Sequence, residues 1–380
     1  MGGTGGAAGH AAGGSVGTGG SGTCTNTASD ANNCGTCGHS CQGGACSSGA
    51  CQPLLLGTVP STTEYAHQTT VSGGKVYVFT GDGQNNPSNV WQVDASTPGT
   101  PSEVKTSGTV SCLMNGELFW MTSGQGFGIA SCTITSCATT AKPIVTLPSG
   151  QYFQTGLGCD AVNNELIWAS TADGLSFTIN RSSPAGTNAR PITSLTFPDN
   201  YWHVIDGGQF TGGTDRLFYE HYDFSASTDY RYYVSTKALN AAGVQLVKVQ
   251  NVGLGPSLAS APLDLANDTV LLVSEYSTAG AYSILSIPLP NGIISGSVPV
   301  FSDGYIYGGV LDSTNFFGTV WSSATIPQDA IIRCPLSGCS NPVIMARGQA
   351  MASNFADDGS AIYWTTTGQG SNVAIWKIAK

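Results

Sequence analysis

The residues best suited to chemistry in this sequence are its cysteines, and six of the twelve lie between Cys24 and Cys51. Their order is Cys24-x9-Cys34-x2-Cys37-x3-Cys41-x4-Cys46-x4-Cys51. A zinc ribbon needs two CxxC pairs separated by a loop that folds back, whereas only one CxxC occurs here. Six cysteines without a core of their own fit three disulfides better, although fifteen pairings are possible. We therefore predict a disulfide segment over residues 24–52 with no metal and no cofactor. His39 is expected to be a solvated loop histidine, with a zinc ligand as the alternative.

The other six cysteines lie on predicted strands and turns. Two pairs share C-x4-C spacing and fall between the third and fourth strands of a repeat: Cys132 with Cys137, and Cys334 with Cys339. A hairpin turn can bring such a pair to the roughly 5.5 Å Cα separation that a disulfide needs. Cys112 and Cys159 occupy equivalent places in neighbouring repeats, so we expect a bridge between them, with two buried free thiols as the alternative.

Histidines and aromatic residues on predicted inner strands form a second candidate site. The candidates for ligand contact are Tyr65, His67, Tyr201, Trp202 and His203. Tyr and Trp suit sugar or aryl recognition, because the ring packs while its polar group forms a hydrogen bond. Packing within the fold is the alternative. No catalytic residue is assigned, since the sequence has no GxSxG motif and its Gly-rich start lacks the Lys-Ser/Thr of a phosphate loop.

The elements that must position these residues are short strands that repeat from Pro53 onward. An apolar and aromatic run recurs seven times, starting at Lys75, Glu117, Glu165, Arg216, Thr269, Gly318 and Ala361. A turn precedes most of these runs and a second alternating strand follows each. The spacing of about 42 to 54 residues lies in the range of propeller blades.

These repeats predict an all-β fold, a seven-bladed β-propeller with six or eight blades as alternatives. The last repeat stops after its third strand, and the run over residues 52–61 resembles the fourth strands of other repeats. We expect this run to pair with residues 373–379 and close the ring, a packed linker being the alternative. The predicted domains are a flexible Gly/Ala-rich, disordered tether over residues 1–23, the disulfide segment over 24–52, and the propeller over 53–380.

Composition narrows the partners and the location. The net charge is −10 and the 13 Lys and Arg residues do not cluster, which argues against nucleic acid. No apolar run approaches the roughly 20 residues of a membrane span. The first residues lack the features of a signal peptide, so the start is expected to be truncated, with a possible lipid anchor upstream. Twelve cysteines and 9% charged residues favour an extracellular or outer cell-surface location.

The stretch NNCGTCGHSCQGGACSSGACQ, residues 32–52, resembles the Cys-rich segment of many secreted myxobacterial proteins and, more weakly, the stigma-specific Cys-rich domains of plants. In those bacterial proteins the segment often lies between a Gly/Ala-rich tether and a propeller with YWT motifs. The matching runs here are AIYWTTTG, ELFWMTSG and CPLSGC. The resemblance implies a location and a shape. It implies no reaction and no ligand.

Taken together, these patterns favour a non-enzymatic binding or scaffold protein that recognises a protein or a glycan through a propeller face. The first alternative is an extracellular carbohydrate-active lyase or hydrolase with its site at the mouth of the channel. The second alternative is a structural component of a surface coat. Acidic residues are few and scattered, so we expect no enzymatic activity; converging Asp, Glu, His or Arg at one mouth would indicate an enzyme.

Overall fold

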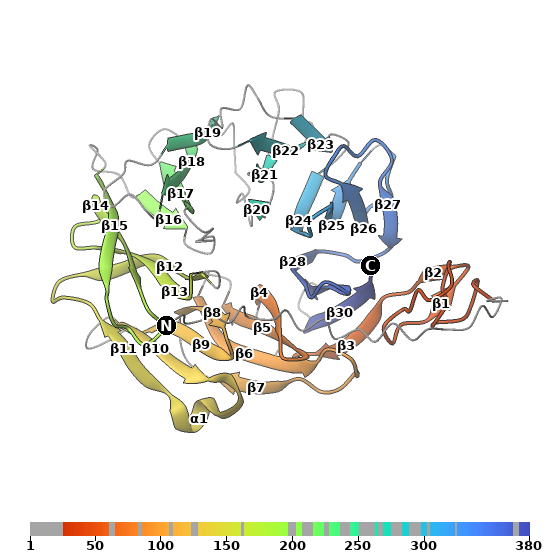
Figure 1. The fold of residues 1–380 in the computed structure, drawn as a ribbon, viewed down its shortest axis with the longest axis horizontal. Helices are drawn as coiled ribbons and strands as arrows, with labels where there is room; N and C mark the ends of the chain where they lie inside the picture. Colours follow the sequence, from red (N-terminus) through yellow and green to blue (C-terminus); the bar gives the residue numbers. More distant parts are fainter. Residues whose placement is uncertain are drawn as a thin grey trace, which may run out of the picture.

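The fold consists almost entirely of β-strands, as a computed structural model of the chain shows (Figure 1). The residues that it describes are 26–60, 65–82, 86–105, 109–122, 128–160, 163–196, 203–206, 216–223, 228–235, 244–250, 263–264, 269–274, 283–288, 298–301, 305–323, 325–367 and 372–380. The predicted tether (residues 1–23), Cys24, Tyr201 and Trp202 lie outside these ranges.

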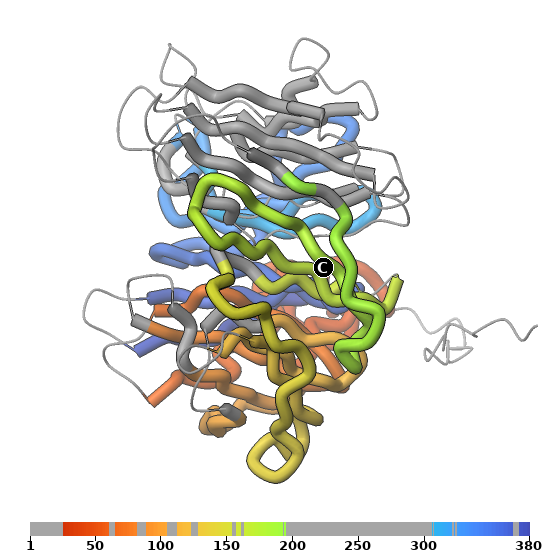
Figure 2. Tube along the Cα trace, turned by 90° about the vertical axis from the view of Figure 1, so that its left-hand side faces the viewer, coloured from red at the N-terminus to blue at the C-terminus, as the bar shows by residue number. Residues whose placement is uncertain are grey.

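The first fifteen strands are β1 (Cys46–Ser47), β2 (Ala50–Cys51), β3 (Leu54–Thr58), β4 (Tyr65–Ser72), β5 (Lys75–Asp82), β6 (Asn86–Asp94), β7 (Ser102–Lys105), β8 (Thr109–Met114), β9 (Glu117–Thr122), β10 (Gly128–Thr133), β11 (Lys142–Thr146), β12 (Tyr152–Asp160), β13 (Glu165–Thr171), β14 (Ser176–Ser182) and β15 (Arg190–Thr196). The others are β16 (His203–Asp206), β17 (Arg216–Asp223), β18 (Thr228–Ser235), β19 (Val244–Gln250), β20 (Leu263–Asp264), β21 (Thr269–Ser274), β22 (Ser283–Pro288), β23 (Val298–Phe301), β24 (Tyr305–Leu311), β25 (Asn315–Ser322), β26 (Ala330–Pro335), β27 (Val343–Ala346), β28 (Ala352–Asp357), β29 (Ala361–Thr367) and β30 (Val373–Ala379). A short helix, α1 (Cys137–Thr140), follows β10 on a hairpin that projects from the outer edge of the ring (Figures 1 and 2).

The described strands form seven four-stranded antiparallel sheets and one two-stranded sheet, β1-β2. The sheets stand around a common axis, and the first strand of each lies nearest to it (Figure 1). We call these seven strands, β4, β8, β12, β16, β20, β24 and β28, the inner strands. We call the end at which an inner strand begins its upper end. The end at which a tight turn leads into the second strand of the sheet is its lower end.

The second strand of each sheet is apolar on both faces because a neighbouring sheet covers each face. In β5, the four residues from Val76 to Phe79 are at most 3% exposed. Val76 and Val78 join a core cluster with residues of β29 and β30, whereas Tyr77 and Phe79 join a second cluster with residues of β9 and β10. Full burial of each such side chain stabilises the fold by roughly 1.5–3 kcal/mol. This two-sided packing explains why the apolar runs are continuous rather than alternating.

The last sheet combines strands from far apart in the sequence. β3 pairs antiparallel with β30, with Leu54 opposite Lys377 and Thr58 opposite Ala374. Leu56 is fully buried in the cluster shared with the sheet of β4. The apolar run that follows the cysteines thus forms the outer strand of the sheet β28-β29-β30-β3.

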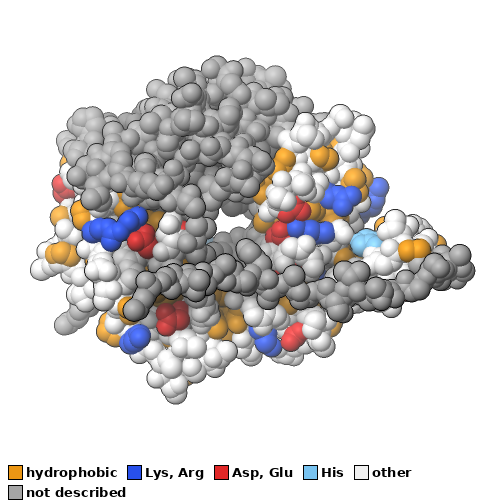
Figure 3. Space-filling model, viewed as in Figure 1, with side chains coloured by type: hydrophobic (Ala, Val, Ile, Leu, Met, Phe, Trp, Pro, Cys, Tyr) orange, Lys and Arg blue, Asp and Glu red, His pale blue; other side chains and the backbone are white. Residues whose placement is uncertain are grey.

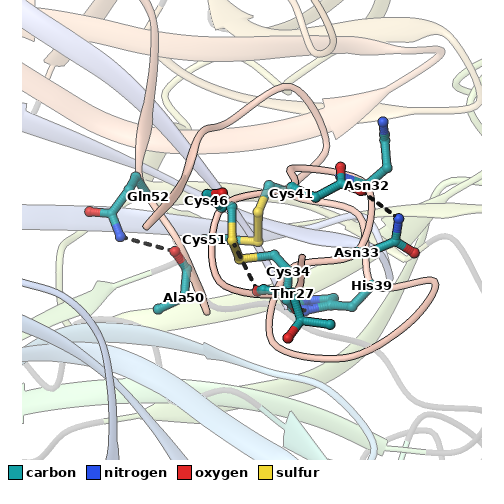
Figure 4. Close-up of a disulfide and its surroundings, with 12 residues drawn as sticks. Thr27, Asn32, Asn33, Cys34, His39, Cys41, Cys46, Ala50, Cys51 and Gln52 are labelled. Atoms are coloured by element: carbon teal, nitrogen blue, oxygen red, sulfur yellow. Dashed lines mark hydrogen bonds between the residues drawn. A yellow bond between two sulfur atoms is a disulfide. The ribbon is translucent and has the colours of Figure 1, made fainter. Parts of the chain in front are cut away.

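Ten described cysteines are assigned to five disulfides. Three of these bonds, Cys132–Cys137, Cys334–Cys339 and Cys112–Cys159, are the pairs that the spacing predicts. The other two, Cys34–Cys46 and Cys41–Cys51, lie in the disulfide segment (Figure 4). Cys37 is also disulfide-bonded. The bonds indicate an oxidising environment.

Among the described residues, no helix is long and apolar enough to cross a membrane.

Candidate functional site

The structure separates the residues that the sequence grouped as a ligand site. Tyr65 begins β4 and is 55% exposed, and His67 lies two residues further along the same strand. His203 begins β16, and the sheets of β8 and β12 lie between β4 and β16 around the ring (Figure 1). Tyr65 and His67 therefore lie at the upper end of one inner strand, and His203 lies on another inner strand.

Every inner strand with a long described ladder has a β-bulge near its upper end. In β4, Ala66 faces Thr80 and Gln68 faces Phe79, so His67 is the extra residue. Corresponding irregularities occur in β8 after Thr109, in β12 after Phe153, in β24 after Tyr305 and in β28 after Ser353. A bulge re-aims the side chain of its extra residue and is common beside functional sites. The upper ends of β4, β8, β12, β24 and β28 thus share an irregular backbone.

At the upper ends, the structure describes the largest number of side chains where β28 and β4 lie side by side. Asn354, in the bulge of β28, donates from Nδ2 to the carbonyl oxygen of Ala66 at 2.8 Å. The same amide lies 3.3 Å from the hydroxyl of Thr365. Asn354 has φ 52° and Met351, just before β28, has φ 55°, both in the left-handed region. Such backbone costs free energy and gathers at functional sites. We call residues 65–68 and 351–355 the β4–β28 mouth.

The groups exposed at the β4–β28 mouth are suited to a ligand that is partly apolar and partly polar. Tyr65 is 55% exposed and Met351 is 45% exposed. His67, two residues after Tyr65, is partly buried, and Gln68 is exposed. An imidazole can accept or donate a proton near neutral pH, and a phenol ring can pack on a sugar face. Figure 3 shows the ring from the side on which the histidine of the disulfide segment lies, with a hollow near the centre.

Three inner strands, β12, β24 and β28, end in turns capped by aspartate. Asp160 accepts from the backbone of Asn163 at 3.1 Å, and Asp312 accepts from the backbone of Thr314 at 2.8 Å. Asp358 accepts from the backbone of Ala361 at 2.8 Å. These are Asx turns, in which the carboxylate replaces a backbone acceptor. The aspartates here are explained by the turns that they cap.

One of these turns anchors a buried polar chain. The hydroxyl of Tyr363, which is fully buried, donates to Asp358 at 2.7 Å. Burial opposes the ionised form of Asp358, but its hydrogen bonds from Tyr363 and Ser360 outweigh burial and lower its pKa. Burial, reinforced by the bond to Asp358, raises the pKa of Tyr363. Lys377, whose pKa is lowered by burial, donates to the carbonyl oxygen of Ala95 at 2.9 Å and so ties β30 to the sheet of β4.

The cysteines of the disulfide segment are not thiolates available to a metal. The sulfur atoms of Cys34, Cys41 and Cys51 lie within 4.8 Å of one another. Cys34 forms a disulfide with Cys46, and Cys41 forms a disulfide with Cys51. Within the ranges that the structure describes, this is the one cluster with the spacing of a metal site.

His39 differs from its predicted environment. The sequence indicates a solvated loop histidine, yet the ring is partly buried, and both of its nitrogens lie within hydrogen-bond distance of backbone oxygens. That prediction is wrong because the disulfide segment packs against the ring of sheets, which a local pattern of Gly and Cys does not indicate. Asn354 and Met351 were not predicted either. The one signal in the sequence is Asn354, an asparagine inside a strand, since asparagine tolerates the left-handed backbone conformation.

Comparison with known proteins is informative for the fold. No family model matches the sequence, and no curated protein matches it. A puromycin-hydrolysing peptidase from Mycobacterium tuberculosis is similar in structure, with TM-score 0.56 and 10% identity over 86% of this chain and 54% of that one. This chain thus spans about half the length of that peptidase.

Two further solved structures match along nearly their whole length. The β-propeller domain of the trilobed protease from Pyrococcus furiosus has TM-score 0.52 and 10% identity over 83% of this chain and 95% of that one. An oligogalacturonate lyase from Vibrio parahaemolyticus has TM-score 0.57 and 9% identity over 85% of this chain and 92% of that one. At such identity the likeness shows the fold, and it confirms an all-β architecture of the propeller type.

The comparisons correct one expectation. The sequence analysis expected a protein without enzymatic activity, on the ground that acids are few and scattered. The solved structures with this fold include peptidases and an oligogalacturonate lyase, so the fold is one that enzymes use. Scattered acids were a poor criterion, because acid–base chemistry can also be carried by histidine or tyrosine.

Proposed function

We propose that this chain is an extracellular carbohydrate-active enzyme, a polysaccharide lyase, whose site is the β4–β28 mouth. The observation that supports it best is the match to the oligogalacturonate lyase over 85% of this chain and 92% of that one. The peptidase, in contrast, extends well beyond the matched region. The proposal assigns the reacting groups to the ring of sheets, which is the part that the match to the lyase covers.

The proposal includes a finer architecture. The seven four-stranded sheets are the blades of a propeller, and the pairing of β3 with β30 closes it. The disulfides support an extracellular or outer cell-surface location. The Cys-rich segment and the YWT-like runs, which resemble those of secreted myxobacterial proteins, agree with the same location.

The residue types at the upper end favour a lyase over a hydrolase. The first four residues of β4, β8, β12, β24 and β28 include no Asp or Glu, whereas the short strands β16 and β20 each end in an aspartate. A glycoside hydrolase ordinarily needs two carboxyl groups that flank the scissile bond. A lyase needs one base that takes the proton next to the sugar carboxyl group, after which a double bond forms and the glycosidic oxygen leaves. Histidine serves as such a base near neutral pH.

Two residues have distinct roles in this proposal. His67, aimed by the bulge of β4, is the base. Tyr65, 55% exposed at the start of the same strand, supplies an aromatic face for the sugar ring. The left-handed backbone at Asn354 and Met351 shapes the opposite side of the mouth. No step is assigned to a metal ion, since the described residues gather no histidine and carboxylate set around the axis.

The test is an assay of the purified chain on uronic acid polymers, which follows the ultraviolet absorbance of the unsaturated product. We expect His67→Ala to lower kcat about 100-fold, the smaller end of the range for a lost acid–base group. Tyr65→Ala should raise KM with a smaller effect on kcat. The control is Val343→Ala, on the outer strand β27, where the side chain is 47% exposed.

Three outcomes would refute the proposal. The first is full activity of a folded His67→Ala protein, which would exclude this histidine as the base. The second is the release of reducing ends without the absorbance of an unsaturated sugar, which would indicate a hydrolase. The third is the absence of cleavage of every polymer in the panel by the wild-type protein.

A further inference from the structure

The disulfide segment, residues 26–52 of the described chain, is part of the core of the ring. Its cysteines enter a buried cluster with side chains of β25, β26, β29 and β30. That cluster includes Cys34, Cys41, Cys51, Phe317, Ile331, Ile362 and Ile378. Cys34 is fully buried and Cys41 is 2% exposed. The segment therefore lies against the last two sheets, and its detachment would expose apolar surface.

His39 makes the polar contact between this segment and the end of β30. Nδ1 lies 2.7 Å from the carbonyl oxygen of Cys34, and Nε2 lies 2.8 Å from the backbone oxygen of Lys380. Both partners are oxygens without a hydrogen, so each can only accept. A neutral imidazole has one N–H, and only the imidazolium ion has two. Both contacts are therefore hydrogen bonds only when His39 is protonated.

Loss of the proton would affect the two contacts differently. The contact with Cys34 is local and is supported by a bond from the backbone N–H of Cys34 to the carbonyl of His39 at 2.8 Å. The neutral tautomer with a hydrogen on Nδ1 would keep it. Nε2 would then point a lone pair at the oxygen of Lys380, which is repulsive. Deprotonation thus breaks one of the two contacts, and in this tautomer the contact between the segment and β30 is the one that is lost.

Charged groups from both neighbouring sheets lie around this contact. Lys380 itself is paired, since its Nζ lies 3.0 Å from Asp312 and 2.6 Å from Asp357. Asp312 follows β24 and Asp357 ends β28, so both neighbouring sheets contribute a carboxylate. Asp358 lies next to Asp357, and the segment contributes Asp30, which accepts from Asn33 at 2.7 Å. Two carboxylates pair with the ammonium group of Lys380, so its charge is compensated beside the contact with His39.

We propose that His39 is a pH-sensitive latch that holds the disulfide segment on the end of β30. In its protonated form it bridges Cys34 and Lys380. When His39 loses its proton, the bridge to Lys380 opens and the segment loosens against the last two sheets. This device is independent of the proposed lyase activity, because the latch lies at the lower end of the inner strands and the β4–β28 mouth lies at the upper end.

The test is hydrogen exchange of the whole chain, measured by mass spectrometry at pH 5.5 and pH 8.0 and corrected for the intrinsic rate. Amide hydrogens over residues 34–41 should lose about tenfold protection at the higher pH, in line with a lost hydrogen bond to a charged group. His39→Gln should remove this pH dependence. The matched control, His67→Gln, should leave it unchanged.

Two results would overturn the latch. One is equal corrected protection of residues 34–41 at both pH values in the wild-type protein. The other is the same pH dependence in His39→Gln. Should that variant fail to fold, nitrogen-15 spectra of wild-type protein labelled at histidine decide the question. A ring with two N–H groups at pH 5.5 and one at pH 8.0 supports the latch at His39, and a ring that is neutral at pH 5.5 refutes it.

Discussion

The two ends of the inner strands are built in opposite ways. At the lower end, aspartates cap the turns of three sheets, as at Asp312 and Asp358. At the upper end, the ladders are interrupted by bulges, and Met351 and Asn354 adopt left-handed backbone. The same strand is therefore regular at one end and irregular at the other. Regular turns contribute stability, and irregular backbone places side chains where a ladder would not.

This difference separates residues that hold the ring from residues that could contact a ligand. A polar network lies at the lower end, where the buried Tyr363 donates to the exposed Asp358 and the buried Lys377 lies over the Tyr363 ring. The exposed aromatic ring of Tyr65 lies at the upper end. Substitutions at the lower end should change the free energy of unfolding, and substitutions at the upper end should change activity.

The largest effect on stability is expected from removal of the disulfide Cys112–Cys159, which joins the inner strands β8 and β12. Cys112→Ser with Cys159→Ser removes a disulfide that spans 47 residues, which should cost about 4 kcal/mol of unfolding free energy. The matched pair Cys132→Ser and Cys137→Ser removes one that spans 5 residues and should cost about 2 kcal/mol. Urea unfolding measures both. Equal losses would show that chain entropy is not the main contribution.

A smaller effect is expected at the turn between β28 and β29. Asp358→Ala leaves the buried hydroxyl of Tyr363 without its acceptor, so the unfolding free energy should fall by about 2 kcal/mol. Asp358→Asn keeps an acceptor and should lose less. Asp173, at an upper turn, caps Ser176 at 2.7 Å without a buried partner, so Asp173→Ala should lose less than half as much. A larger loss at Asp173 would break the contrast between the two ends.

The smallest effect is a gain in stability at the upper end. Met351→Gly relieves left-handed backbone at a side chain that is 45% exposed, and should stabilise the fold by about 0.5–1 kcal/mol. Met351→Ala keeps the strain and serves as the control. Thermal melting measures the gain. If the mouth is functional, the glycine variant should be more stable and less active, and unchanged activity would separate the strain from the function.

The second strands were the most predictable elements, because a continuous apolar run carries its own signal. The run from Val76 to Phe79 needs two neighbours to bury it, and a repeat of such runs predicts sheets packed face to face. The disulfides with short spacing were predictable for a similar reason. In Cys132–Cys137 and Cys334–Cys339, the chain between the two cysteines is too short to carry them far apart.

The candidate site was only half predictable. Tyr65 and His67 could be assigned to an inner strand, but the bulge that makes His67 the extra residue depends on how β4 pairs with β5. The left-handed residues Met351 and Asn354 depend on the junction with the neighbouring sheet, which no local propensity reports. The contact of His39 with Lys380 joins two regions that only the folded ring brings together.

The pairing of β3 with β30 also has a consequence for biosynthesis. The two strands lie near opposite ends of the sequence, so the last sheet stays incomplete while the chain is still emerging from the ribosome or crossing a membrane. Until β30 arrives, β3 presents an unpaired edge and an apolar Leu56 to its surroundings. Completion of the ring is therefore a late, non-local step, and such steps are slow compared with the formation of local hairpins.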